Sequence, residues 1–112
     1  MATNVILANG TRPATTGIIL LYTSPPGSGG TRIIAFTASN VSANTETYKV
    51  WIVPNGGTPT DDNRIIPLSS LYTLDNEAPP ELQNHLIQPG GSLHVQVSTS
   101  STISFRATGI EF

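Results

Sequence analysis

The sequence predicts an all-β fold, an antiparallel β-sandwich of jelly-roll-like type with about seven or eight strands. Short runs rich in β-branched and aromatic residues recur along the chain, and Gly, Pro, Asn and Ser separate them. No helical period extends over more than about ten residues. The chain has 112 residues, of which 38% are apolar, so it can bury one core. We therefore expect a single sandwich domain over residues 1–112.

Four segments of the first half have the character of strands. The turn dipeptide Asn9–Gly10 follows the first, and Pro25–Pro26 ends the second, because proline cannot continue a ladder of strand hydrogen bonds. SPPGSGG, residues 24–30, and NGGTPTDDN, residues 55–63, are expected to be exposed loops. The four strand candidates are Asn4–Ala8, Gly17–Thr23, Arg32–Asn40 and Thr45–Pro54.

The third and fourth of these segments alternate in polarity, which assigns side chains to faces. Arg32–Asn40 and Thr45–Pro54 are expected to pair as an antiparallel hairpin across a turn around Val41–Asn44. In the third segment one face carries Ile34, Phe36 and Ala38, and the other carries Ile33, Ala35, Thr37 and Ser39. In the fourth, one face carries Tyr48, Val50 and Ile52, and the other carries Thr47, Lys49, Trp51 and Val53.

The second half contains four further elements. Pro67 lies within Arg64–Leu74 and favours an edge strand or a broken strand, with a short helix at Ser69–Leu74 as the alternative. Leu82–Gln88 is a further strand candidate. The last two runs are predicted to form a half-buried hairpin across a turn at Thr99–Thr102. Their inward residues are Leu93, Val95 and Val97, then Ile103, Phe105 and Ala107, and their outward residues are His94, Gln96 and Ser98, then Ser104, Arg106 and Thr108.

Composition excludes several classes of function. Only 11% of residues are charged, against about 25% in ordinary soluble domains, which suits a protein packed against neighbours. The five basic residues are scattered singly, so no direct nucleic-acid partner is expected. The absence of cysteine excludes disulfides and thiolate metal sites. MATNVILANG does not resemble a signal peptide, and Ile18–Leu21 is too short to span a bilayer, so we expect neither secretion nor a membrane partner.

The sequence shows no convincing catalytic, cofactor or metal site. His85 and His94 lie in adjacent strand candidates without flanking carboxylates, and we expect them to be ordinary surface or interface histidines. Asp61–Asp62–Asn63 lacks the spaced acids of a calcium loop and is expected to be a solvated turn. The glycine-rich loops precede no helix, so they are not phosphate loops.

The remaining candidates are also better explained without catalysis. A carboxylate pair would have to come from Asp75, Glu77, Glu81 or Glu111, and three of these fall in one proline-rich connection. Asn40–Val41–Ser42 matches a glycosylation sequon, which we interpret as a coincidence. Trp51 is expected in the core, with an interface anchor as the alternative. No enzyme activity is predicted.

Several segments together resemble small structural proteins of tailed bacteriophage virions. They are "LANGT", "GIILLYTSPPGSGG", "TASN" followed by "YKVWIVP", "PGGSLHVQVS" and the terminal "ATGIEF". The similarity spans most of the chain except residues 64–81. Members of this group are capsid decoration (cement) proteins or parts of the neck, tail and fibres. The resemblance implies a non-enzymatic subunit, made in the host cytoplasm, that decorates the capsid surface.

The implied partners are the major capsid protein or other virion proteins, and the chain is expected to form a homo-oligomer, a dimer or trimer. A neck, tail or fibre subunit is the first alternative, and a carbohydrate-binding sandwich is the second. Contact residues are expected in the N-terminal arm, the two long loops, the tryptophan and the C-terminal segment Ile110–Phe112. The two loop segments are Pro25–Gly30 and Asn55–Asp62. The expected contact residues are Ala2, Thr3, Asn4, Pro25, Pro26, Gly27, Ser28, Trp51, Asn55, Gly56, Thr58, Pro59 and Phe112.

Overall fold

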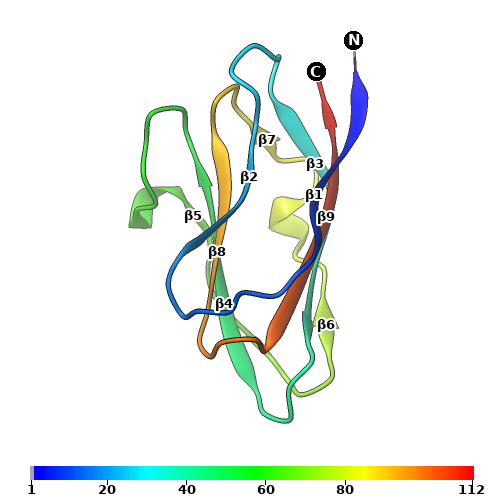
Figure 1. Cartoon of the computed structure of the whole chain (residues 1–112), viewed down its shortest axis with the longest axis vertical. Coiled ribbons are helices and arrows are strands. Elements are labelled where there is room, and N and C mark those ends of the chain that lie inside the picture. Colours follow the sequence, from blue (N-terminus) through cyan, green and yellow to red (C-terminus); the bar gives the residue numbers. More distant parts are fainter. Residues whose placement is uncertain (1) are drawn as a thin grey trace.

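Alternating apolar side chains build two antiparallel sheets whose inner faces enclose a common core. The computed structural model describes residues 2–112. Figure 1 shows the two sheets packed face to face. Sheet A contains β1 (Thr3–Thr11), β9 (Ile103–Glu111), β3 (Thr31–Asn40) and β6 (Asn76–Glu77) in this order, and β7 (Leu86–Ile87) also pairs with β3. Sheet B contains β2 (Ile19–Thr23), β8 (Ser92–Val97), β4 (Glu46–Val53) and β5 (Arg64–Leu71).

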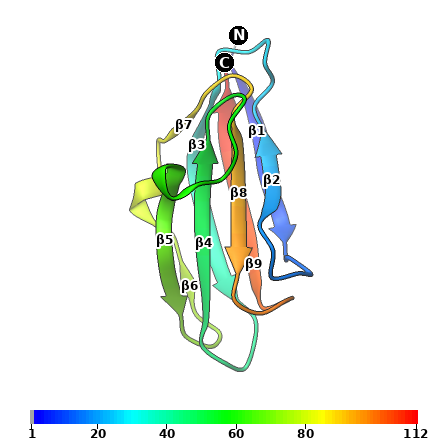
Figure 2. The same ribbon diagram turned by 90° about the vertical axis from the view of Figure 1, so that its left-hand side faces the viewer.

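The connections alternate between the sheets in the manner of a jelly roll. The chain passes from β1 in sheet A to β2 in sheet B, back to β3 and across again to β4, and β8 and β9 also lie in different sheets. Figure 2 shows the strands of sheet B side by side in front of sheet A. This strand order, with two interleaved Greek keys, confirms the predicted all-β sandwich of jelly-roll type.

Both predicted hairpins are wrong. β3 and β4 do not pair, because β3 bonds to β9, β6 and β7, whereas β4 bonds to β8 and β5. β8 pairs with β2 and β4, and β9 pairs with β1 and β3. A strand with one buried face gives the same alternating pattern whether its sequence neighbour lies beside it or across the core. The pattern alone therefore does not select the partner.

The core is built from the predicted inward faces of β8 and β9 and from the face of β4 that carries Tyr48 and Val50. Tyr48 and Phe105 pack edge to face with ring centroids 5.7 Å apart, and Phe36 lies 5.9 Å from Phe105. Leu93, Val95, Val97, Ile103, Phe105 and Ala107 are all buried in this cluster. Buried aromatic contacts of this kind stabilise the sandwich through both area and geometry.

The predicted faces of β3 are wrong at its start because the strand contains a bulge. Ile33 pairs with Gly109 and Ala35 pairs with Thr108, so Ile34 has no partner on β9. Ile33 is fully buried and Ile34 is 43% exposed, so Ile34 does not share the buried face of Phe36 and Ala38 as predicted. One extra residue shifts the alternation, and from Phe36 onward the predicted face is buried.

The middle of the chain is only partly strand. β5 forms the edge of sheet B, as Pro67 predicts, and no helix forms at Ser69–Leu74. The predicted strand Leu82–Gln88 is reduced to β7, because Leu82 lies in a short 3-10 helix, η2 (Pro80–Leu82). A second such helix, η1 (Asp61–Asn63), precedes β5. Within residues 2–112, no helix is long and apolar enough to cross a bilayer.

Candidate interaction surfaces

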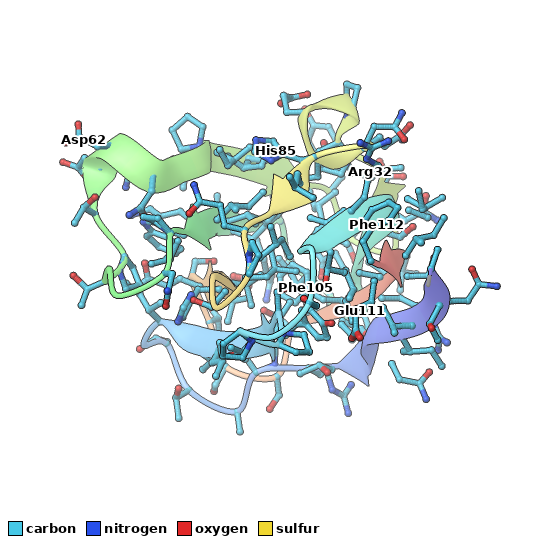
Figure 3. The ribbon with its side chains drawn as sticks, turned by 90° about the horizontal axis from the view of Figure 1, so that it is seen from above. Arg32, Asp62, His85, Phe105, Glu111 and Phe112 are labelled. Carbon is cyan, nitrogen blue, oxygen red and sulfur yellow. The ribbon has the colours of Figure 1, made fainter. Side chains whose placement is uncertain are left out.

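The expected contact segments lie at one end of the sandwich, except for Trp51 and the part of the second loop that leads into η1. Thr3 pairs with Glu111, so the two ends of the chain are adjacent, as Figure 1 shows. Strand directions bring residues 24–30 and 54–60 to the same end, which Figure 3 views directly. We call this the terminal end, and define it as residues 2–4, 24–30, 54–60, 88–91 and 112. Segments that are distant in the sequence therefore form one surface.

The loop of residues 24–30 is held at both of its ends. The amide of Ser24 donates to the carbonyl of Gly91 (2.9 Å), and the Ser24 hydroxyl lies 2.9 Å from that of Thr31. At the other end, Gly29 donates to the carbonyl of Phe112 (2.7 Å), and the amide of Phe112 donates to Gly30 (2.9 Å). The prolines and Gly27 remain exposed between these anchors. The loop is therefore a fixed projection on the terminal end.

The loop of residues 54–63 folds back against sheet B. Within it, Asn63 accepts a hydrogen bond from the amide of Thr60 (3.0 Å) and donates to the carbonyl of Thr58 (3.0 Å). A Cβ on Gly90, which has φ +78°, would lie 2.6 Å from the Asn55 amide oxygen. The start of this loop is thus packed against the connection before β8. Asn55, Gly56 and Thr58 are exposed, and Pro59 is half-buried.

Trp51 is covered by the chain itself. Its register neighbours are His94 on β8 and Arg64 on β5. Trp51 therefore shares a face with Lys49, as predicted, but this is the outer face of sheet B and not the core face. It is nevertheless only 4% exposed and lies outside the main core cluster, where η1 contacts β4. Trp51 is therefore a buried residue, but in a small satellite cluster, and it is not available as an exposed interface anchor.

The titratable groups considered in the sequence do not converge on a site. His85 lies beside β7 in sheet A, whereas His94 is on β8 in sheet B. Burial lowers the pKa of His94, because desolvation disfavours its charged form. In the part of the chain that the structure describes, no three His, Asp or Glu side chains are grouped as metal ligands.

The acidic turn and the sequon have structural roles. Asp61 pairs with Arg64 at 3.3 Å. Asn40 is 2% exposed, and its side-chain amide donates to the carbonyls of Asn44 (2.7 Å) and Leu71 (3.0 Å). Its oxygen accepts from the amide and the hydroxyl of Ser42. An amide with these partners inside the fold is not accessible as a glycosylation acceptor.

A polar bridge that was not predicted joins the two sheets at their β5 and β6 edges. Tyr48 of β4 and Ser69 of β5 both donate hydrogen bonds to Oε1 of Glu77 on β6, the latter at 2.6 Å. Burial raises the pKa of Tyr48 above its ordinary value, and the bond to Glu77 raises it further. Only the tertiary structure reveals this contact, because it joins strands of different sheets and Tyr48 is 29 residues from Glu77 in the sequence.

Two shallow hollows of the described residues lie on opposite outer faces of the sandwich. The hollow on sheet B encloses about 280 Å³ and has Lys49 as its only charged lining residue. The hollow on sheet A also encloses about 280 Å³ and is mainly apolar. We call it the isoleucine groove; it is lined by Asn4, Val5, Ile6, Ile34, Thr108, Gly109 and Ile110. Ile6 is 63% exposed there.

Sequence reasoning missed the isoleucine groove except for Asn4 and Ile110. The β3 bulge turns Ile34 outward, and pairing places Ile6 beside Thr108 on the central strand β9. Arg32 lies next to Ile110 in the register and stacks over the ring of Phe112, 5.7 Å from its centroid. Figure 3 shows Arg32 and Phe112 together above the end of sheet A. The groove is therefore continuous with the terminal end.

No protein-family model matches this chain, and no curated protein is significantly similar to it in sequence. Solved structures share its fold. A subunit of Bacillus endospore appendages, described as a novel family of disulfide-linked pili, superimposes with a TM-score of 0.61 and 8% identity, over 99% of this chain and 87% of that one. A protein of the infectious bursal disease virus particle has a TM-score of 0.62 and 12% identity, over 99% of this chain and 30% of that one.

A second structure of the same virus, from the Gx strain, has a TM-score of 0.59 and 12% identity and covers 99% of this chain. The present chain spans 30% and 32% of the two viral chains. At these identities the similarity shows a common sandwich fold. Function does not follow from a shared fold, because unrelated activities occur on the same architecture.

Proposed function

We propose that this protein is a non-enzymatic structural subunit of a virion, and that it decorates an assembled capsid shell and stabilises it. The observation that carries the proposal is the convergence of the N-terminal arm, the two long loops and Phe112 on the terminal end. Anchored loops of low charge suit a contact surface, because few charges are desolvated and little conformational freedom is lost on binding.

The physical mechanism is linkage between binding and assembly. A decoration subunit that contacts two neighbouring shell subunits binds the assembled lattice and not the free subunits. Its binding free energy then opposes any opening of the joint that it covers. The jelly-roll fold shared with a protein of a viral particle supports this proposal, since it is a rigid block suited to symmetric repetition.

The test uses empty shells assembled from the major capsid protein encoded in the same genome. We expect the purified protein to co-sediment with these shells, not with unassembled capsid subunits, and to raise the temperature at which the shells disassemble. The terminal-end variant Asn4→Ala, Pro26→Ala, Thr58→Ala should lose binding. A matched variant at the opposite end, Thr15→Ala, Asn44→Ala, Ser100→Ala, should retain it. Equal binding by both variants would exclude the terminal end as the contact surface.

A neck, tail or fibre subunit remains the alternative within the virion. Bacillus appendages use a similar sandwich as a fibre subunit, but they are described as disulfide-linked, and this chain has no cysteine. The copy number per particle distinguishes these locations, since a decorated shell carries many more copies than a neck or tail ring. A carbohydrate-binding role would require binding on a glycan array, whereas the decoration proposal expects none.

A further inference from the structure

Most charged side chains in residues 2–112 have no ion-pair partner. Within residues 2–112 the only ion pair is that between Asp61 and Arg64. The other exposed carboxylates, Asp62, Asp75 and Glu81, lie on or beside η1, β6 and η2. On β3 and β9 of sheet A, Arg32 and Arg106 are exposed, and neither is in an ion pair. Unpaired groups of opposite sign on different parts of one molecule favour contacts between copies, because each group then gains a partner.

The isoleucine groove is the first of two surfaces that could form such a contact between copies. Ile6, Ile34 and Ile110 surround it, and Arg32 borders it at the terminal end. Arg32 contacts the ring of Phe112 and has no carboxylate partner in the structure. Glu111 lies between Ile110 and Phe112 in the sequence, so strand alternation points it to the other face. The groove is therefore apolar and bordered by a cation.

The complementary surface is the turn between β5 and β6, at the end opposite the termini (Figure 1). We call Tyr72, Leu74 and Asp75 the acidic ridge. Tyr72 is 72% exposed and Leu74 is 81% exposed, the two most exposed large apolar side chains described. Apolar side chains this exposed, beside a carboxylate, are typical of a binding surface.

The acidic ridge is also held in shape. The amide of Asp75 donates to the carbonyl of Tyr72 (3.2 Å), and the amide of Asn40 on β3 donates to the carbonyl of Asp75 (2.9 Å). Thr73 donates its hydroxyl hydrogen to the carbonyl of Ser42. A turn that is already ordered loses little entropy when it docks.

We propose that the acidic ridge of one copy docks into the isoleucine groove of a second copy, with Asp75 beside Arg32 of the receiving copy. Two grooves do not suit each other, because a symmetric contact would bring arginines together without a carboxylate. Ridge and groove are different surfaces at different ends, so the contact is head to tail and leaves a free ridge and a free groove for further copies. This inference does not depend on the proposed virion role.

The test is sedimentation velocity of the purified chain at rising concentration and at low and high salt. The wild-type protein should associate beyond the dimer as concentration rises, and salt should weaken the association because the ion pair is screened. The groove variant Ile6→Ser, Ile34→Ser and the ridge variant Tyr72→Ser, Leu74→Ser should each raise the dissociation constant by at least about tenfold. Leu20→Ser, which alters an apolar residue on sheet B of similar exposure, is the matched control.

Mixing the two defective variants gives the decisive result. The groove variant retains a ridge and the ridge variant retains a groove, so an equal mixture should form dimers and nothing larger. Near-ultraviolet circular dichroism confirms that each variant is folded. A wild-type protein that remains monomeric, a mixture that forms no dimers, or equal loss of association in Leu20→Ser would each overturn the proposal.

Discussion

Tyr48 of β4 donates a hydrogen bond to Glu77 of β6 and thereby ties the two sheets together along their β5–β6 side. Tyr48 is 1% exposed, and its ring belongs to the aromatic core. The phenol therefore links the core to a polar edge, and the carboxylate is shared with Ser69. This relationship gives two predictions, one about stability and one about pH.

Tyr48→Phe should lower the free energy of unfolding by about 1 to 2 kcal/mol, because a hydrogen bond to a charged acceptor is lost while the ring is kept. Equilibrium urea unfolding measures this change. Tyr72→Phe is the control. Because Tyr72 is exposed, this substitution should change the free energy of unfolding by no more than about 0.5 kcal/mol. Equal effects of the two substitutions would contradict the bridging role.

The same bridge predicts a loss of stability in alkaline solution. The pKa of Tyr48 is raised from 10.0 in the folded state, so the folded protein holds this proton more tightly than the unfolded chain does. The stabilisation is complete below pH 10 and declines as the pH rises above it, by up to about 1.4 kcal/mol per pH unit. The measurement is the difference in unfolding free energy between wild type and Tyr48→Phe from neutral to alkaline pH. A difference in unfolding free energy that stays constant with pH would contradict the predicted alkaline loss of stability.

The lowered pKa of His94 predicts a loss of stability in acidic solution. Burial lowers its pKa from 6.5, so the folded state favours the neutral ring, and the unfolded chain binds the proton more readily. The contribution of His94 is thus present above pH 6.5 and is lost as the pH falls below that value. Relative to His94→Gln, the wild-type protein should become less stable on acidification. Parallel stability curves for the two proteins would count against this assignment.

The buried side-chain amide of Asn40 should contribute more to stability than the side chain of a nearby exposed asparagine. Asn40→Ala leaves the carbonyl of Leu71 without this donor inside the fold and should destabilise the protein by about 2 to 3 kcal/mol. Asn44→Ala is the matched control, because Asn44 is exposed and contributes its backbone carbonyl to the cluster. Thermal unfolding followed by circular dichroism compares the two, and similar midpoints would show that the Asn40 network contributes little.

Gly109 lies opposite the bulge that turns Ile34 outward. A Cβ at this position would approach the carbonyl oxygen of Arg32 to 2.5 Å, so Gly109→Ala should push β9 away from β3. We expect a loss of at least about 2 kcal/mol, as for other backbone clashes in a packed sheet. Gly27→Ala, where a Cβ meets nothing within 4 Å, should be nearly neutral. Unfolding in urea measures both, and a neutral Gly109→Ala would mean that the strands separate at little cost.

Part of the candidate surface was predictable and part was not. The loops 24–30 and 55–63 were recognisable from proline and glycine, which interrupt strand pairing. Their convergence with the chain ends was not recognisable, because it depends on strand direction and sheet order. The isoleucine groove was missed because a bulge has no distinct signature in an alternating pattern, and the face of Ile34 was therefore assigned wrongly.

The sequence by itself determined the class of fold, the inward faces of β8 and β9, and the grouping of Tyr48 with Val50 on one face of β4. Alternation of apolar and polar residues is a local property, and burial of one sheet face imposes it directly. The tertiary structure alone decided that β3 pairs with β9 and not with β4, that Tyr48 meets Glu77, and that Ile6 and Ile34 line one groove. These relationships depend on which strands hydrogen-bond across long stretches of chain, and many pairings bury the same residues equally well.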